Sequence, residues 1–246
     1  ITSILQNELG YLLRGEVVWL KQRGSSGSCA WGSFRSPTNP VLRDTTERLI
    51  MASKGRFDRA IVPAKRAKRG LPSVSTSTSD EFIEATIDVW EIQPESATRV
   101  NHPAPFPVTL AERCIDLYSF KGDLVLDPFM GSGTTNIAAR QLGVDSLGNE
   151  AHPFVYEITL SKMAWDLNDK LVRKFIEALS STVVIPNETI VSKSNSNRFP
   201  ELLHKCFLPP TLYALGEIRD QVKKSRLGND EKRFLRTALI CSLRDI

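Results

Sequence analysis

Apolar residues follow two different periods along this chain. Short apolar runs predict strands at 15–21, 47–53, 87–92 and 124–126, and the run at 87–92 is rich in β-branched and aromatic residues. In the last fifty residues the apolar positions instead recur every three or four residues, at 211–224 and again at 231–245. The pattern therefore predicts a sheet-containing part followed by a helical hairpin.

Helical patterns also lie between the predicted strands. The segment 4–13 has a helical pattern interrupted at Gly10 and leads into the first strand. Further helices are expected at 113–118 and 136–142, from His152 towards Trp165, and between 168 and 190. This alternation predicts an α/β fold.

The stretch 122–150 is the most informative part of the sequence. Leu124–Leu126 is a short apolar strand that ends at Asp127 and passes into the glycine turn Gly131-Ser132-Gly133. A helix and a second short strand ending at Glu150 follow. The order strand, glycine turn, helix, strand predicts one half of a doubly wound sheet.

The chemistry of this half follows from its backbone and its acids. Glycines at 131 and 133 lack the Cβ atoms that would keep a ligand away from the main chain. Glu150 follows Asp127 by 23 positions, close to the spacing at which an acid accepts hydrogen bonds from ribose hydroxyls. Thr134 and Thr135 stand where a phosphate-binding loop would carry its lysine, which argues against ATP.

The string 127–135, Asp-Pro-Phe-Met-Gly-Ser-Gly-Thr-Thr, resembles the S-adenosylmethionine motif of the DNA amino-methyltransferases. These enzymes methylate N4 of cytosine or N6 of adenine. The preceding segment 102–107, with Leu110, Arg113 and Ile115, is similar to the family's other cofactor segment. The resemblance implies S-adenosylmethionine as the cofactor, held by Pro105, Phe106, Asp127, Phe129, Gly131, Ser132, Gly133, Thr134, Thr135 and Glu150.

Two further segments resemble parts of the same family. Residues 14–21 are similar to the segment that follows the family's catalytic motif, and residues 30–44 to a stretch found in one of its branches. Trp31 and Arg35 lie in the second segment, where stacking and phosphate contacts would suit double-stranded DNA. The alternative, that the aromatic residues only pin the loop to the core, is equally open.

A basic segment follows the second predicted strand. Between Lys54 and Arg69 there are seven basic residues and one acid, and the polar tract 73–79 comes next, too polar to pack. Such a run is often a solvated face. Beside the methyltransferase motif, we expect it to be a partly mobile arm that binds DNA phosphates through Lys65, Arg66, Lys68 and Arg69.

The catalytic motif of the family is absent. These enzymes carry an Asp/Ser/Asn-Pro-Pro-Tyr/Phe loop, whereas the single Pro-Pro pair here is Leu208-Pro209-Pro210-Thr211. We therefore name no catalytic residue. Because elements that follow the catalytic loop come first here, the order resembles the permuted class, and the loop is expected before Ile1 or, as the alternative, after Ile246.

The predicted fold is a doubly wound, Rossmann-like α/β methyltransferase sheet, incomplete, with a C-terminal helical extension. Four domains are expected. They are part of the sheet with a DNA-facing loop at 1–53, the basic arm at 54–85, the cofactor-binding half at 86–167 and the helical extension at 168–246.

Composition narrows the remaining possibilities. With 41% hydrophobic and 24% charged residues, the chain has the composition of a soluble globular protein, and no apolar run approaches a membrane span. We expect a cytoplasmic location and leave a homodimer open. Four scattered cysteines and three separate histidines do not form metal-ligand spacings, so no metal is expected.

The expected function is site-specific methylation of an exocyclic amine of DNA, with cytosine N4 slightly preferred over adenine N6, in a restriction-modification system. One alternative is a DNA-binding remnant that has lost catalysis. The other is a methyltransferase that acts on RNA or on a small molecule. The net charge of +4 is too small to distinguish between these three functions.

Overall fold

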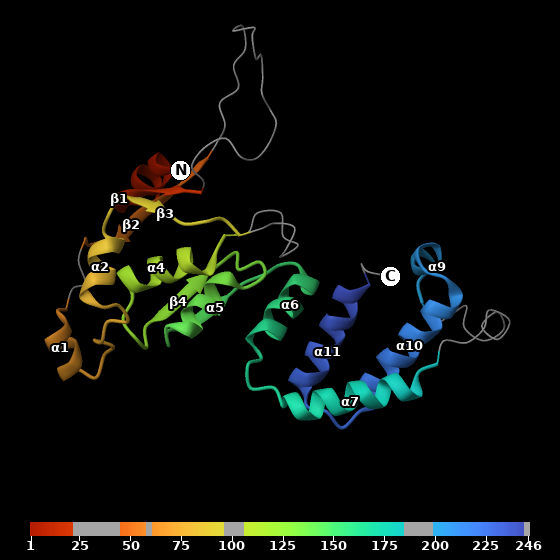
Figure 1. Ribbon diagram of the computed structural model, residues 1–246. Coiled ribbons are helices and arrows are strands. Elements are labelled where there is room, and N and C mark those ends of the chain that lie inside the picture. The colour runs from red at the N-terminus through yellow and green to blue at the C-terminus, as the bar shows by residue number, and fades with distance from the viewer. Residues whose placement is uncertain (22–44, 58–60, 96–105, 185–198, 244–246) are drawn as a thin grey trace, which may run out of the picture. The chain divides into compact units, whose positions relative to one another are not determined.

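The computed structural model describes residues 1–21, 45–57, 61–95, 106–184 and 199–243 (Figure 1). The chain divides into two compact units, residues 1–150 and residues 151–246. The strands of the described residues all lie in the first unit, and the second is helical. The mixed α/β architecture and the C-terminal helical extension are therefore confirmed, while the four predicted domain boundaries stay a prediction.

The first sheet of the first unit has the strand order β2-β1-β3. Strand β1 (Tyr11–Leu20) pairs antiparallel with β2 (Thr46–Lys54), with an irregularity between Leu13 and Gly15, and parallel with β3 (Val89–Glu91). A short π-helix, η1 (Ile4–Glu8), precedes it. The helix expected at 4–13 is thus too long, because Gly10 has a φ of +67° and the chain enters β1 at Tyr11.

The second sheet consists of two parallel strands. Strand β4 (Leu124–Asp127) pairs with β5 (Asp145–Gly148), and helix α5 (Thr134–Gln141) connects them. This is the strand, turn, helix, strand unit expected at 122–150, although the second strand ends two residues before Glu150. The predicted strands therefore form two sheets within the described residues.

Helix α4 (Val108–Tyr118) packs on both sheets of the first unit. Its Leu110 belongs to a buried cluster with Trp19 and Trp90, whereas its Ala111 and Ile115 join a cluster formed with α5. The indole Nε1 of Trp19 donates to the Ile92 carbonyl at 2.7 Å. The buried N–H of this tryptophan therefore has a hydrogen-bond acceptor within the cluster that contains Trp19 and Trp90. In Figure 1, α4 runs between the first sheet and the β4–α5 unit.

The segment between β2 and β3 has defined partners. Helix α1 (Pro63–Lys68) precedes the polar tract, and Thr78 caps α2 (Ser79–Ala85) in a reciprocal capping box with Glu81. Ser75 forms an isolated bridge with Phe120, and the hydroxyl of Thr76 donates to Asp116. The tract expected to be too polar to pack is therefore joined to α4 and its C-terminal end by hydrogen bonds.

The second unit is built from helices only, within the residues that the structure describes. An apolar cluster of Val172, Val222, Leu227 and Leu235 holds three of them together. The helices are α6 (Pro153–Met163), α7 (Asp169–Thr182), α9 (Glu201–Cys206), α10 (Pro209–Lys224) and α11 (Asn229–Ser242). The two amphipathic stripes predicted near the C-terminus are α10 and α11, and Pro209–Pro210 forms the first turn of α10. No described helix has the length and apolar character needed to cross a membrane.

Arg66 of α1 forms a largely buried ion pair that gives a stability prediction. Its guanidinium lies 3.1 Å from Asp123 Oδ1 and 4.9 Å from the Phe120 ring, and the two charged side chains are 12% and 15% exposed. Arg66→Ala leaves Asp123 without its cation, so we expect the free energy of unfolding in urea to fall by about 3 kcal/mol. The exposed neighbour Lys65→Ala should change it by less than about 0.5 kcal/mol. Equal urea midpoints for the two variants would contradict the assignment.

Candidate functional site

The turn between β4 and α5 needs two left-handed backbone positions. Gly131 has a φ of +51° and Gly133 a φ of +85°, and Gly133 is the N-cap residue of α5. A side chain at Gly133 would be strained, because residues with a Cβ rarely adopt this conformation. The chain therefore reverses between strand and helix with bare backbone at its surface.

Asn149 fixes this turn to the end of β5. Its N–H donates to the Asp127 carbonyl at 2.9 Å, its carbonyl accepts from the Met130 N–H at 3.0 Å, and its Nδ2 donates to the Pro128 carbonyl at 3.3 Å. Glu150 is the next residue, so the same bonds bring it beside the turn. Asn149 was not among the residues predicted from the sequence. Its position directly before the predicted acid Glu150 could have indicated that it belongs to the site.

Asp127 and Phe129 occupy the outer side of the turn. The Asp127 Oδ1 accepts the Phe129 N–H at 3.0 Å, which orients the carboxylate at the carboxyl end of β4. The Phe129 ring is 89% exposed, more than any other large apolar side chain that the structure describes. An uncovered aromatic ring beside an oriented carboxylate is suited to contact a ligand with both apolar and hydroxyl groups.

Close packing supports the turn from below. Met130 is buried, and a Cβ at Gly148 would lie 2.1 Å from its sulfur. Asn136 of α5 is buried as well, and its Nδ2 donates to the Ser146 hydroxyl at 3.1 Å. Gly148 is therefore required so that Met130 can fill the space between the turn and β5.

The structure brings most of the predicted cofactor residues together. Ser132 lies within the turn, Thr134 and Thr135 begin α5, and Phe106 packs against both apolar clusters of the first unit. Pro105, Trp31 and Arg35 lie outside the described residues. The position and roles of these three stay a prediction.

An apolar hollow of about 470 Å³ lies beneath α4. Its lining includes Leu49 of the first sheet, Val125 of the second, and Phe106 and Thr135 from the predicted cofactor set. Cys114 of α4 also lines it, and burial raises the pKa of this thiol to about 11. The thiol is therefore protonated at neutral pH and is not a nucleophile.

The basic residues predicted to contact DNA lie on and just after α1, but they are not equivalent. Lys65, Lys68 and Arg69 are exposed. Arg66 is instead held by Asp123 and Phe120, and its Nε donates to the Pro72 carbonyl. The structure thus gives Arg66 an internal role, because its guanidinium donors are directed into the protein.

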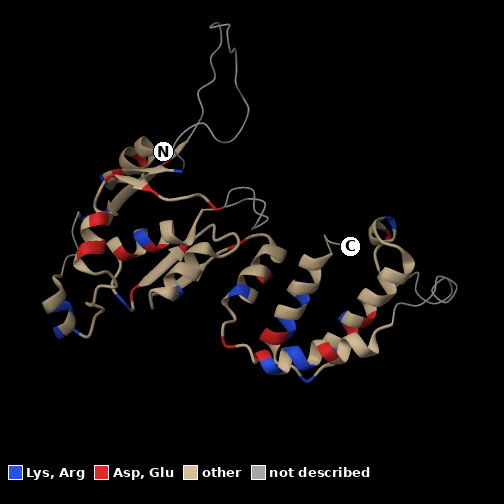
Figure 2. Cartoon of the chain, viewed as in Figure 1, with Lys and Arg blue, Asp and Glu red and all other residues tan. Residues whose placement is uncertain are grey.

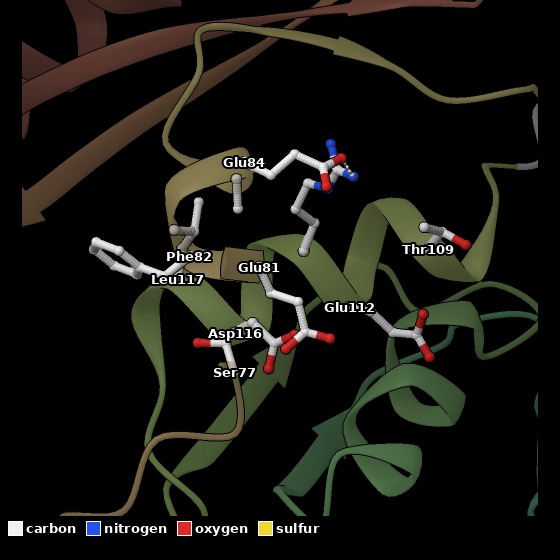
Figure 3. A pocket seen from close by; sticks show the side chains of 10 residues that line it. Ser77, Glu81, Phe82, Glu84, Thr109, Glu112, Asp116 and Leu117 are labelled. Atoms are coloured by element: carbon white, nitrogen blue, oxygen red, sulfur yellow. Dashed lines mark hydrogen bonds and ion pairs between the residues drawn. The ribbon is translucent and has the colours of Figure 1, made fainter. Parts of the chain in front are cut away.

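A second, acidic pocket lies between α2 and α4 (Figure 3). Its volume is about 160 Å³, below the roughly 300–1,000 Å³ of small-molecule sites. Burial and the neighbouring Asp116 raise the pKa of Glu112, while Glu84 pairs with Arg113 at 2.9 Å. None of the predicted cofactor residues lines this pocket, and its carboxylates would repel DNA.

The contact between Gly148 and Met130 gives a prediction about the turn. Gly148→Ala should lower the free energy of unfolding by about 1–3 kcal/mol, because the new methyl group displaces the Met130 side chain. In a Met130→Ala background the same change should cost less, since the obstructing sulfur is gone, but some cost should remain because Asn136 Oδ1 and the Cβ at position 130 would still lie 2.9 and 3.0 Å from the new methyl group. A double-mutant cycle in urea measures the difference. Equal costs in both backgrounds would show that the sulfur does not set the need for glycine.

Comparisons with known proteins agree on one family. The family model described as DNA methylase matches residues 1–161. The Type II methyltransferase M.MthZI of Methanothermobacter thermautotrophicus is 31% identical over 147 residues, which are 57% of this chain and 40% of that protein. M.MjaI of Methanocaldococcus jannaschii is 30% identical over 158 residues, 61% of this chain and 49% of that protein.

One solved structure is similar to part of this chain. A Thermus thermophilus protein described as a DNA modification methylase, crystallised with S-adenosyl-L-methionine, is 28% identical with a TM-score of 0.47. The match covers 66% of this chain and 57% of that one. The chain spans about half the length of the curated relatives that it matches. Because the family model covers well over half of its residues, this chain belongs to the DNA methylase family.

Proposed function

We propose that this chain is the cofactor-binding part of a DNA amino-methyltransferase, with S-adenosylmethionine bound at the turn between β4 and α5. The observation that carries the proposal is the turn itself. Two left-handed glycines, the carboxylate of Asp127 and the uncovered ring of Phe129 meet there, with Glu150 next to the residue that fixes the turn.

The residues present fit this cofactor in chemical terms. Glu150 and Asp127 are acceptors at the carboxyl ends of two adjacent parallel strands, where a nucleoside's hydroxyl groups can donate to them. Phe129 offers an apolar surface, and the absence of Cβ atoms at Gly131 and Gly133 lets a ligand approach the backbone. When bound, S-adenosylmethionine supplies an electrophilic methyl group on a sulfonium.

The substrate is proposed to be double-stranded DNA, methylated at an exocyclic amine, in a restriction-modification system. The exposed basic residues Lys65, Lys68 and Arg69 support phosphate contacts, and Trp31 and Arg35 remain proposed contacts. The relatives' names include Type II methyltransferases. Cytosine N4 stays the slightly preferred target on general similarity.

Methyl transfer needs groups that this chain does not encode. An exocyclic amine is a weak nucleophile because its lone pair is delocalised into the base, so acceptors must draw on its hydrogens. The base must also leave the duplex and stack on an aromatic ring. The family's tetrapeptide that supplies both is absent, and Pro209–Pro210 is part of helix α10.

The hollow beneath α4 supports the proposal that further polypeptide completes the site. Parallel sheets are normally covered on both faces, and their inner strands pair on both edges. Within the described residues, β4 pairs only with β5, and Leu124, Leu126 and Leu147 are more than half exposed. We propose that the segment with the amine acceptors adds a strand beside β4 and fills the hollow.

The cofactor assignment predicts a loss of affinity in Glu150→Ala. Removing a charge-assisted hydrogen bond costs on the order of 1.5–3 kcal/mol, so the dissociation constant for S-adenosylmethionine should rise roughly ten- to a hundred-fold. Isothermal titration calorimetry measures it. Asp145→Ala is the matched control, because Asp145 is exposed and lies at the opposite end of β5. An unchanged affinity in Glu150→Ala would overturn the assignment.

The absence of the tetrapeptide predicts cofactor binding without methyl transfer. Residues 1–246 incubated with radiolabelled S-adenosylmethionine and mixed-sequence duplex DNA should retain bound label yet leave the DNA unlabelled. A longer polypeptide that includes the tetrapeptide loop should label the DNA. Robust labelling by residues 1–246 alone would show that another group here, such as one in the 36–40 segment, replaces the missing loop.

A further inference from the structure

The net positive charge of the chain resides in its second unit. Residues 151–246 contain 15 lysines and arginines against 11 aspartates and glutamates, whereas residues 1–150 contain 17 of each. The first unit, which holds the cofactor turn, is therefore neutral as a whole. Most of the basic residues of the second unit, which could attract a polyanion, lie on helices that the methyltransferase motif does not explain.

Six of these basic residues lie in the last turn of α10, in the segment that follows it and in the N-terminal part of α11, where Figure 2 shows basic segments in blue. Arg233 is neutralised locally, since it lies 2.6 Å from Asp230 and 3.1 Å from Glu157. The other five make no ion pair with any residue that the structure describes. They are Lys223, Lys224, Arg226, Lys232 and Arg236, and all but the half-buried Lys232 are exposed.

Hydrogen bonds and packing connect the backbone segments that carry these five residues. Lys232 Nζ donates to the Lys223 carbonyl at 3.3 Å, which joins the start of α11 to the end of α10. Arg236 follows one turn later, and its Nε donates to the Lys232 carbonyl. Beneath them Val222, Leu227 and Leu235 are buried in the core of this unit. The backbone that carries these basic residues is therefore fixed by packing in the core of this unit.

We propose that this α10–α11 basic surface, defined by Lys223, Lys224, Arg226, Lys232 and Arg236, binds the phosphate backbone of duplex DNA. The inference rests on the proposed function, which supplies the polyanion, and it adds a second contact surface separate from α1. Phosphate contacts of this kind position a protein on DNA without reading its sequence.

Salt dependence tests the surface directly. The full chain is titrated with fluorescent mixed-sequence duplex DNA at several salt concentrations, as wild type and with Lys223, Lys224, Arg226 and Arg236 all changed to Ala. Each lost phosphate contact lowers the slope of log K against log salt by about 0.9, so the slope should flatten by about 3 to 4. A charge-conserving control, with each Lys changed to Arg and each Arg to Lys, should keep the wild-type slope.

Parallel measurements separate this inference from the proposed function. Calorimetry with S-adenosylmethionine should give the same affinity for the wild type and the alanine variant, which also shows that the variant is folded. If the wild type does not bind S-adenosylmethionine, the proposed function is overturned. The change in salt dependence between the wild type and the alanine variant would still test the basic surface by itself. An unchanged slope in the alanine variant overturns the proposed role of the basic surface. The same conclusion follows if the wild type binds polyglutamate of equal charge as tightly as it binds the duplex.

Discussion

Helix α4 carries the constraint on which the first unit depends, because one apolar stripe has to pack against two separate sheets. Leu110 is buried against the tryptophans of the first sheet, while Ala111 and Ile115 are buried against α5 and Val144. Residues at these spacings lie on one side of the helix. Any change that tilts α4 therefore moves the cofactor turn relative to the first sheet, and Phe106 at the start of the helix moves with it.

The turn shows how a binding surface can be rigid without side chains of its own. Asn149 uses its N–H, carbonyl and amide to fix Asp127, Met130 and Pro128, and the sulfur of Met130 fills the space that Gly148 leaves. The glycines of the turn can thus remain bare. The positioning is done by residues that face inward, which is why a motif search finds the glycines and overlooks their supports.

The order of the strands and helices was predictable from the sequence, since β2 forms at the expected apolar run and α10 and α11 form at the expected helical periods. It failed where a contact between distant residues decides the outcome. The basic run could not show that Arg66 turns inward while its neighbours Lys65 and Lys68 stay exposed, because Asp123 lies 57 positions away. Nor could the polar composition of 73–79 show that Thr76 finds Asp116 on α4. Most of the candidate site residues could be predicted because they form one continuous sequence motif. Their packing partners could not, because those lie far away in the sequence.

The distribution of charge follows from an electrostatic conflict between the two proposed ligands. A sulfonium cation and ribose hydroxyl groups favour the acids at the ends of β4 and β5, but the same carboxylates repel DNA phosphates. Basic residues placed among them would be neutralised, as Arg113 is by Glu84 and Arg66 by Asp123. The basic residues at the turn between α10 and α11 escape this neutralisation, because Lys223, Lys224 and Arg226 make no ion pair with any residue that the structure describes and belong to the unit that does not contain the proposed cofactor turn.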